Sequence, residues 1–266
     1  MWPVPRLAAI YLYPVKGCRG VQVERAEVVE RGLQGDRRWM IVDQDDQFVT
    51  QRQDPRLALV GVTPGLDGFE LSAPGLPPVP IPWALEDGPV RTVQVWRHVG
   101  EAREHAAGSA WITGHLGAPH RLVYMPDSHR RAVNPEKAGP GHIVGFADAY
   151  PFLLIGQASL DDLNGRLPEP VDMRRFRPNL VVEGSPAFAE DGWHRLQIGA
   201  LAFRGVKPCE RCTVTTVDPD TAARGPEPLR TLSTYRKQGN LVMFGMNLVH
   251  DQRGTIAVGD RVDPLT

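Results

Sequence analysis

Short runs of apolar and β-branched residues, each broken by glycine or proline, constrain the fold of this chain most strongly. The 266 residues include 27 glycines and 25 prolines, and proline gives no hydrogen-bond donor to a helix interior or a central strand. Apolar or alternating runs of about four to eight residues between such breaks are typical of β-strands. The sequence therefore predicts a mainly β protein, with strands in LAAIYLYPV, VQVERAEVV, RWMIVDQ, QFVTQ, VRTVQVW, LVVEG, LQIGALAFRGV, TVTTV, VMFGMNLVH and IAVGDRV.

Two segments have helical rather than strand patterns. Residues 101–117 place several alanines and Trp111 near one face, and Gly117 is positioned to end the helix. The second segment, SLDDLNGRL, starts with Ser159 as an N-cap and has Asp162 three residues later, which resembles a capping box. We expect two short helices at these places.

The connecting segments divide the chain. Asp45-Asp46 indicates a hairpin turn, and the proline-rich stretch 74–82 is unsuited to a central strand. A segment rich in proline, glycine and asparagine covers residues 126–142. The pattern predicts two mainly β units joined near residues 117–121.

Composition and charge exclude several classes of protein. Thirty basic and 31 acidic residues give a net charge of −1, whereas binding to nucleic acid through bulk electrostatics needs clustered positive charge. No apolar run reaches the length of about 18 residues that a membrane-spanning helix needs. The N-terminus, MWPVPRLAAIYLYPVKG, has no basic region ahead of its apolar stretch and no small-residue cleavage site. We therefore expect a cytoplasmic protein that binds neither a nucleic acid duplex nor a membrane.

The three cysteines, Cys18, Cys209 and Cys212, are too few for a disulfide framework or a four-thiolate iron–sulfur cluster. Cys209 and Cys212 form a C-x-x-C pair, which fits a zinc half-site, a redox dithiol or two buried inert thiols. No second pair of ligands stands at zinc-finger spacing. A redox dithiol would open a helix, whereas TVTTV favours a strand. The remaining interpretation is one cysteine at the start of a strand, after the cations Lys207 and Arg211.

Three cationic segments are candidate anion sites. Lys16 lies in a glycine-containing turn after an apolar strand, where backbone N–H groups and an ammonium suit an anion. Arg37 and Arg38 would face opposite sides of a strand, so one needs a partner, for example Asp36. MRRFRPN carries three arginines within four residues, which fits a solvated face equally well. Only four of the 30 basic residues are lysines; base composition explains this excess of arginine, although arginine also suits phosphate and planar heterocycles.

Taken in order, LYPVKGCRG, GDRRWMIVD, FRPNLVV and KPCERCTVTTVDPDT…EPLRTLSTYR resemble the motifs of MOSC-domain proteins that carry an N-terminal MOSC β-barrel domain. This group includes bacterial and mitochondrial amidoxime-reducing molybdoenzymes. The resemblance extends from about Leu12 to Val262. It implies a mainly β fold, with a smaller N-terminal β-barrel-like domain over residues 1–118, a MOSC β-barrel domain over residues 119–266 and a few short helices.

The resemblance also implies a molybdenum cofactor, a pterin dithiolene that ends in phosphate. The residues that match the family's cofactor-binding positions are Lys16, Arg37, Arg177 and Asn179. Cys212 matches the cysteine that ligates molybdenum, with Cys209 as the alternative ligand, and a soft thiolate suits such a metal. Pyridoxal phosphate binding attaches to the family only as a label.

The implied activity is the reduction of N-hydroxylated compounds, namely hydroxylamines, amidoximes and N-hydroxylated bases, with electrons from a separate flavin or iron–sulfur protein. Three positions depart from the family. Gly17 replaces a serine, Ala149-Tyr150 precedes Pro151, and Ser185-Pro186 stands where relatives can carry a carboxylate, so no general acid is assigned. Glu190 and Asp191 fit turn residues better. Two alternatives are a non-catalytic carrier of molybdenum cofactor or sulfur, and a structural protein with paired arginines and buried cysteines.

Overall fold

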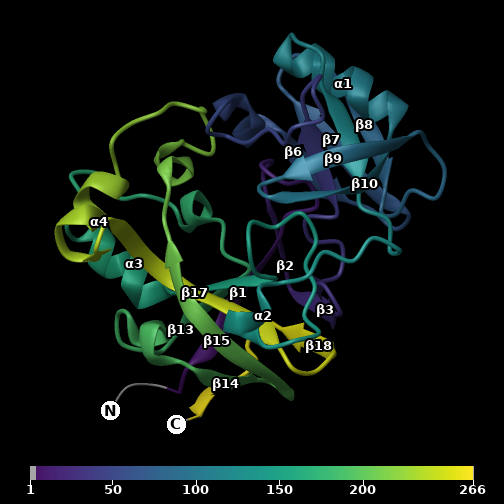
Figure 1. Cartoon of the computed structure of the whole chain (residues 1–266). Helices are drawn as coiled ribbons and strands as arrows, with labels where there is room; N and C mark the ends of the chain where they lie inside the picture. The colour runs from purple at the N-terminus through teal and green to yellow at the C-terminus, as the bar shows by residue number, and fades with distance from the viewer. Residues whose placement is uncertain (1–3, 266) are drawn as a thin grey trace.

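The computed structural model describes residues 4–265 and confirms the mainly β fold (Figure 1). Residues 1–3 and Thr266, which the two predicted domains include, lie outside the described residues. The strands are β1 (Arg6–Leu12), β2 (Val21–Val23), β3 (Arg25–Val29), β4 (Gly32–Leu33), β5 (Trp39–Val42), β6 (Gly61–Pro64), β7 (Gly68–Ala73), β8 (Leu76–Pro82), β9 (Val90–Val95), β10 (His98–Glu104), β11 (Arg121–Tyr124), β12 (Phe152–Gly156), β13 (Leu180–Glu183), β14 (Arg195–Ile198), β15 (Leu201–Glu210), β16 (Lys237–Gln238), β17 (Leu241–His250), β18 (Gly254–Ala257) and β19 (Val262–Leu265). The α-helices are α1 (Ala106–Leu116), α2 (Pro135–Ala138), α3 (Gln157–Asn164) and α4 (Leu229–Tyr235), and the 3-10 helices are η1 (Pro55–Leu59), η2 (Met173–Phe176), η3 (Ala189–Gly192) and η4 (Thr213–Thr216).

A nine-stranded sheet forms the lower body of the molecule in Figure 1. Its order is β19-β14-β15-β17-β12-β13-β1-β2, and β16 pairs with β17 off this path. Strand β12 shows why the sheet is buried on both faces. Phe152 and Leu154 join one hydrophobic cluster, while Leu153 and Ile155 join another that includes residues of α3, η2 and α4. An unbroken apolar run is what a strand covered on both faces requires.

The upper part in Figure 1 contains α1 and two smaller sheets. The four-stranded sheet has the order β5-β11-β10-β9, and β6-β7-β8 form a three-stranded sheet. Trp39, Phe69 and Trp111 are members of the hydrophobic cluster that packs these elements together. The proline-rich β8 lies at the edge of its sheet, where missing N–H donors cost no ladder hydrogen bond.

Strand pairing crosses the predicted division at residue 118. Strand β1 pairs antiparallel with β13, and β3 pairs antiparallel with β18. Strands β1 to β4 therefore belong to sheets that also contain strands from the second half. The division into residues 1–118 and 119–266 stays a prediction.

The prediction of a helix over residues 101–117 is correct at its end and wrong at its start. Gly117 adopts a left-handed backbone with φ 66° and caps the helix, a conformation that glycine takes without strain. The start lies at Ala106, because residues up to Glu104 extend β10 in a ladder with β9. His105 caps the helix by accepting a hydrogen bond from the Gly108 N–H at 3.0 Å.

The prediction of Ser159 as an N-cap is wrong. Helix α3 starts at Gln157 after Gly156, which makes no side-chain capping bond. The Ser159 hydroxyl is buried inside the helix and donates to Glu190 Oε2 at 2.9 Å. The Ser159 side chain therefore binds Glu190, which is distant in the sequence, and does not cap the helix.

Two predicted strands are also corrected. TVTTV forms η4 rather than a strand, so Cys212 is the N-cap of a 3-10 helix and does not begin a strand. QFVTQ forms no named strand, although Phe48 bridges to Val42 across a turn in which Asp46 has φ 57°. The backbone of TVTTV closes local 3-10 hydrogen bonds, and Phe48 and Val49 of QFVTQ donate to Gln94 and Ile41 without forming a continuous ladder.

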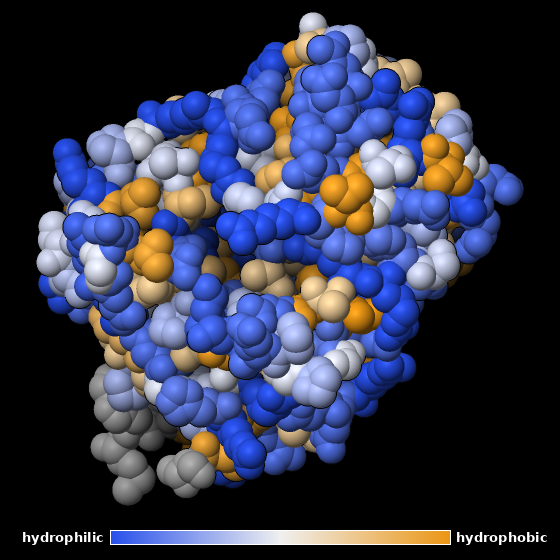
Figure 2. Space-filling view, in the orientation of Figure 1, coloured by the Kyte–Doolittle hydropathy of each residue, from blue (hydrophilic) through white to orange (hydrophobic). Residues whose placement is uncertain are grey.

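The surface seen in Figure 2 is mainly hydrophilic, with small separate hydrophobic areas. Within residues 4–265, no helix is both long and apolar enough to cross a membrane.

Candidate functional site

A cavity of about 490 Å³ is lined by residues from both halves of the chain. It brings together the four cofactor-binding residues that the sequence predicts, Lys16, Arg37, Arg177 and Asn179, and both cysteines of the C-x-x-C pair. These residues lie as much as 196 positions apart along the sequence. The remaining lining residues are Gly17, Thr50, Gln51, Arg52, Trp96, Ala147, Asp148, Ala149, Tyr150, Phe152, Leu153, Phe176, Lys207, Glu210, Arg211, Val214, Leu241 and Asn247.

Lys16 lies in the turn after β1, and only 5% of its surface is exposed. Its Nζ donates to the Phe146 carbonyl at 2.8 Å and forms an ion pair with Asp148. Burial lowers the pKa of Lys16, and the Asp148 charge opposes that shift. The pKa of Asp148 lies well below its ordinary value: its partial burial favours the neutral acid, but the Lys16 ammonium outweighs that effect. The Asp148 carboxylate is therefore ionised at neutral pH.

Arg37 and Arg177 both have left-handed backbones, with φ 43° and 56°. Residues other than glycine adopt this region rarely, and such positions concentrate at functional sites. Arg37 donates to Asp36 at 2.6 Å and to the Arg177 carbonyl at 3.2 Å, and Arg177 donates to the Cys18 carbonyl at 2.6 Å. The expectation that Arg37 lies in a strand is wrong, because β5 begins only at Trp39. The partner expected for one of the two arginines, Asp36, is present.

Tyr13 and Asn179 hold the two guanidinium groups. The Tyr13 ring centroid lies 4.1 Å from Arg37 Cζ and 4.4 Å from Arg177 Cζ. Asn179 Oδ1 accepts from Arg37 Nη1 at 3.0 Å, and its Nδ2 donates to the Tyr11 carbonyl at 3.2 Å. Asn179 therefore fixes the Arg37 fork as well as lining the cavity.

The two cysteine sulfurs each accept a hydrogen bond from an arginine. Cys212 Sγ accepts from Arg52 Nη1 at 3.3 Å, and Cys209 Sγ accepts from Arg211 Nη1 at 3.1 Å. Both cysteines are half-buried, whereas Cys18 is fully buried and burial raises its pKa to about 12. Cys18 is thus an inert core thiol, and the C-x-x-C pair faces the cavity.

Three further candidate residues line the cavity that no sequence motif named: Arg52, Trp96 and Asp148. Trp96 Nε1 donates to Asp148 Oδ1 at 3.2 Å, and Arg52 Cζ lies 4.8 Å from the Trp96 ring centroid. A continuous series of contacts therefore leads from Lys16 through these three residues to the Cys212 sulfur. The segment QRQDPR was the available signal for Arg52, since it places two arginines and an aspartate in a turn.

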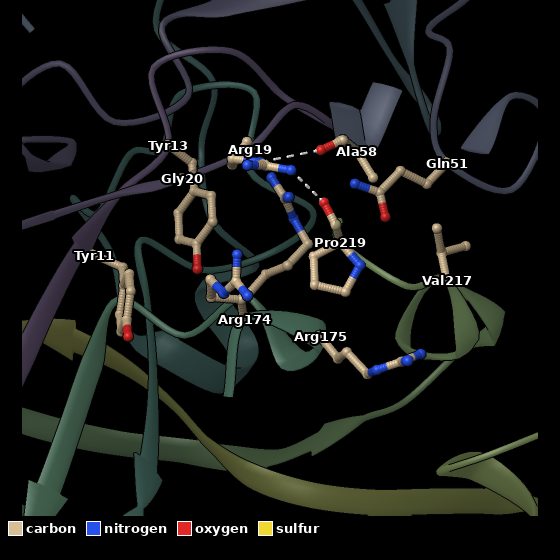
Figure 3. Close-up of a pocket in the computed structure, with 11 residues that line it drawn as sticks. Tyr11, Tyr13, Arg19, Gly20, Gln51, Ala58, Arg174, Arg175, Val217 and Pro219 are labelled. Atoms are coloured by element: carbon tan, nitrogen blue, oxygen red, sulfur yellow. Dashed lines mark hydrogen bonds between the residues drawn. The ribbon is translucent and has the colours of Figure 1, made fainter. Parts of the chain in front are cut away.

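The three arginines of MRRFR have different surroundings. Arg174 forms an ion pair with Asp220 at 2.8 Å and Arg175 with Asp218 at 2.7 Å. Both line a second cavity of about 20 Å³, shown in Figure 3, that shares Gln51 and Arg177 with the large cavity. Of the three, Arg177 alone lines the large cavity. Arg174 and Arg175 form ion pairs outside it, so the segment is divided between a candidate binding residue and two paired arginines.

Glu190 and Asp191 have structural partners. Glu190 is fully buried and accepts hydrogen bonds from the Gly156 N–H at 3.0 Å and from Ser159. Asp191 pairs with Arg236 at 2.5 Å. These contacts fasten η3 to α3 and to the end of α4.

The large cavity is strongly positive although the whole chain carries a net charge of −1. Its lining contains six cationic side chains and two carboxylates, Asp148 and Glu210. Lys16, Arg37 and Lys207 form ion pairs with Asp148, Asp36 and Glu210, whereas within residues 4–265 Arg52, Arg177 and Arg211 have no ion-pair partner. Uncompensated cations in a partly buried site bind anions strongly, because the local dielectric is low. The lining therefore suits a ligand with several negative charges.

The cavity combines cationic side chains with two partly accessible thiols. Such a lining defines a class of mainly β proteins suited to an anionic ligand that contains a soft metal or sulfur. Family comparison gives the class its name: the chain belongs to the MOSC family. The model described as "MOSC domain" matches residues 141–263, and that described as "MOSC N-terminal beta barrel domain" matches residues 4–119.

Relatives that match nearly the whole chain support the same family. The chain is 37% identical to mitochondrial amidoxime-reducing component 1 of Homo sapiens, over 98% of this chain and 86% of the relative. It is 36% identical to mitochondrial amidoxime reducing component 2 of Rattus norvegicus, over 97% of this chain and 83% of the relative.

These relatives contradict the expected cytoplasmic location, because their names place them in mitochondria. The absence of a secretory signal pattern, on which that expectation rested, does not distinguish between compartments inside the cell. The comparisons give no support to the label of pyridoxal phosphate binding.

Proposed function

We propose that this protein is a molybdenum-cofactor-dependent reductase of N-hydroxylated compounds. The observation that carries the proposal is the single cavity that contains Lys16, Arg37, Arg177 and Asn179 together with Cys212. The names of the amidoxime-reducing relatives support the same chemistry.

The donor set fits the cofactor. A terminal phosphate is a dianion, and buried Lys16 together with Arg37 and Arg177 supplies a point charge and two planar forks. Cys212 supplies a soft sulfur donor, the type that molybdenum prefers. A volume of about 490 Å³ lies within the range of small-molecule and cofactor sites.

The residues of the chain bind and orient, while the bound cofactor supplies the two-electron cleavage of the N–O bond. Lys16, Arg37 and Arg177 hold the anionic part, and Asn179 keeps the Arg37 fork directed at it. Asp148 stays ionised at neutral pH, because the Lys16 ammonium keeps its pKa low. We therefore assign Asp148 the task of orienting Lys16 and Trp96 rather than that of donating a proton.

The electrons come from a separate flavin or iron–sulfur protein in this proposal. A small N-hydroxylated molecule, such as an amidoxime, takes up two electrons and two protons and leaves as the N–H compound and water.

The test compares the wild-type chain with Cys212→Ser and Cys209→Ser, all produced in a host that makes molybdenum cofactor. Molybdenum per chain and the reduction of an aryl amidoxime by reduced methyl viologen are measured for each. We expect turnover in the wild type and in C209S, and turnover at background level in C212S with an unchanged circular dichroism spectrum.

Full activity in C212S would exclude Cys212 as the metal ligand. A wild-type chain that holds molybdenum but reduces no N-hydroxylated compound would contradict the reductase and favour the carrier.

A further inference from the structure

Arg131 is a buried cation whose hydrogen-bond partners are backbone carbonyls. Only 7% of its surface is exposed. Its guanidinium donates to the carbonyls of Gly145 at 2.8 Å, Ala147 at 2.5 Å and Asp148 at 2.9 Å. Within residues 4–265 it forms no direct ion pair; its burial lowers its pKa, and the nearby Asp148 charge opposes that shift. Burying a guanidinium is costly, so its contacts with three carbonyls must offset a desolvation penalty.

The segment that Arg131 holds, residues 145–148, connects two of the cations in the large cavity. The Phe146 N–H donates to the Arg37 carbonyl at 2.7 Å, and the Phe146 carbonyl accepts from Lys16 Nζ at 2.8 Å. Asp148, at the end of the segment, forms the ion pair with Lys16. The backbone of one residue, Phe146, therefore contacts both the Arg37 turn and the Lys16 ammonium.

The segment also lies too close to the Arg37 turn to move independently of it. A Cβ atom built on Gly145 would lie 2.7 Å from the Arg37 carbonyl oxygen. Arg131 itself is fastened beside the segment, since its carbonyl accepts from the Val144 N–H at 3.0 Å. Any shift of the three clamped carbonyls is thus passed to Arg37 and Lys16.

We propose that Arg131 is a positioning residue for anion binding: by clamping residues 145–148 it fixes the spacing of Lys16 and Arg37. This proposal rests on the proposed function, which assigns Lys16 and Arg37 to an anionic group. Arg131 also adds positive charge beside the cavity. Counted with its neighbours, the cluster has four cations, Lys16, Arg37, Arg131 and Arg177, against Asp36 and Asp148, a surplus that suits a dianion.

The test uses inorganic phosphate as the probe and the cofactor-free chain. Phosphate that binds the folded state raises the melting temperature by mass action, which gives its dissociation constant. We expect Arg131→Gln to weaken phosphate binding about tenfold, the lower end of the loss found when a residue that orients a metal ligand is replaced. Arg131→Lys recovers part of the affinity, because an ammonium keeps the charge but lacks the fork that reaches three carbonyls.

Arg121→Gln is the matched control. Arg121 also donates to backbone carbonyls, those of Asp43 at 3.1 Å and Gln44 at 3.2 Å, but it holds a turn that does not line the cavity. R121Q lowers the melting temperature and leaves the phosphate dissociation constant unchanged. A second readout needs no ligand: exchange of the Phe146 amide hydrogen speeds up in R131Q and not in R121Q.

If the wild type binds phosphate and R131Q binds it equally tightly, the proposal is overturned, whatever the exchange rate at Phe146. A wild-type chain that does not respond to phosphate would contradict the anion site of the proposed function. In that case faster Phe146 exchange in R131Q still supports the clamp, and unchanged exchange overturns it.

Discussion

At the scale of single residues, His250 at the end of β17 is a titratable group placed where its charged form is disfavoured. It is 6% exposed, and in the described part of the chain its Nδ1 has no hydrogen-bond partner. Burial lowers the pKa of His250 to about 4, and the positive charges of His142 and Arg253 act in the same direction. The ordinary value for histidine is about 6.5.

This shift predicts a loss of stability in mild acid. Above pH 6.5 the imidazole is neutral in both states and costs nothing. As the pH falls from about 6.5 to about 4, the unfolded chain gains a proton at His250 while the folded chain resists it, so the free energy of unfolding decreases. The decrease amounts to at most about 3 kcal/mol. Urea unfolding of the wild type and His250→Gln between about pH 7 and pH 4 measures it, and H250Q should show the smaller decrease.

His194→Gln is the control, since His194 is exposed and its replacement should leave the pH profile of the wild type in place. Equal decreases in the wild type and in H250Q would show that other groups cause the acid sensitivity.

The residues of the cavity could be predicted from sequence only where a motif names them. Lys16, Arg37 and Cys212 stand in distinctive short motifs, and all three line the cavity. Arg131 could not be found in this way, and Arg52 could be found only as one of the charged residues of the turn QRQDPR. Their roles depend on contacts with residues 160 and 14 to 17 positions away, which only the folded chain brings together.

At the scale of elements, the start of α3 is stabilised by a buried network rather than by a cap. The Ser159 hydroxyl is fully buried, donates to Glu190 and accepts from the Phe188 N–H at 2.7 Å. Burial raises the pKa of Glu190, and its hydrogen bonds to Gly156 and Ser159 oppose that shift. The Glu190 side chain of η3 therefore joins η3 to the start of α3.

Replacing Ser159 by alanine should lower the free energy of unfolding by about 2 kcal/mol. The substitution leaves one Glu190 oxygen buried without its partner, which carries a penalty of about 1–3 kcal/mol, and it removes the partner of the part-buried Phe188 N–H. An exposed N-cap serine would cost only about 1 kcal/mol. Denaturant unfolding of S159A gives the value.

Ser233→Ala provides the comparison, because the Ser233 hydroxyl only donates to the Arg230 carbonyl within α4. Its loss should change the free energy of unfolding by no more than about 0.5 kcal/mol. Similar losses in the two variants would contradict the buried network.

Strands with strong apolar patterns were predictable, and element ends were not. VMFGMNLVH and LVVEG form β17 and β13, as their patterns indicate. At Ser159 a distant carboxylate binds the side chain, and at the start of α1 the ladder of β10 with β9 extends to residue 103. At TVTTV the backbone closes local 3-10 hydrogen bonds instead of joining a ladder. Local propensity contains no information on those partners.

At the scale of the whole molecule, the first strands of the chain complete the sheets of the second half. Strand β1 lies between β13 and β2, so its removal would turn β13 into an edge. Leu7, Ile10 and Leu12 of β1 are buried in the same hydrophobic cluster as Leu180 and Val182 of β13. The amino-terminal and carboxy-terminal halves therefore share one core.

Cutting the chain between Gly117 and Ala118, in an exposed loop, tests whether the second half folds without the strands of the first half. The fragment 118–266 alone lacks β1 and β3, and it presents an unpaired β13 edge, which favours aggregation. We expect it to show no cooperative thermal transition by circular dichroism. Produced together, fragments 1–117 and 118–266 should co-purify and unfold in one transition, because the buried contacts between them are restored. A fragment 118–266 that unfolds cooperatively near the melting temperature of the intact chain would show instead that the second half is an independent domain, whose core needs nothing from β1.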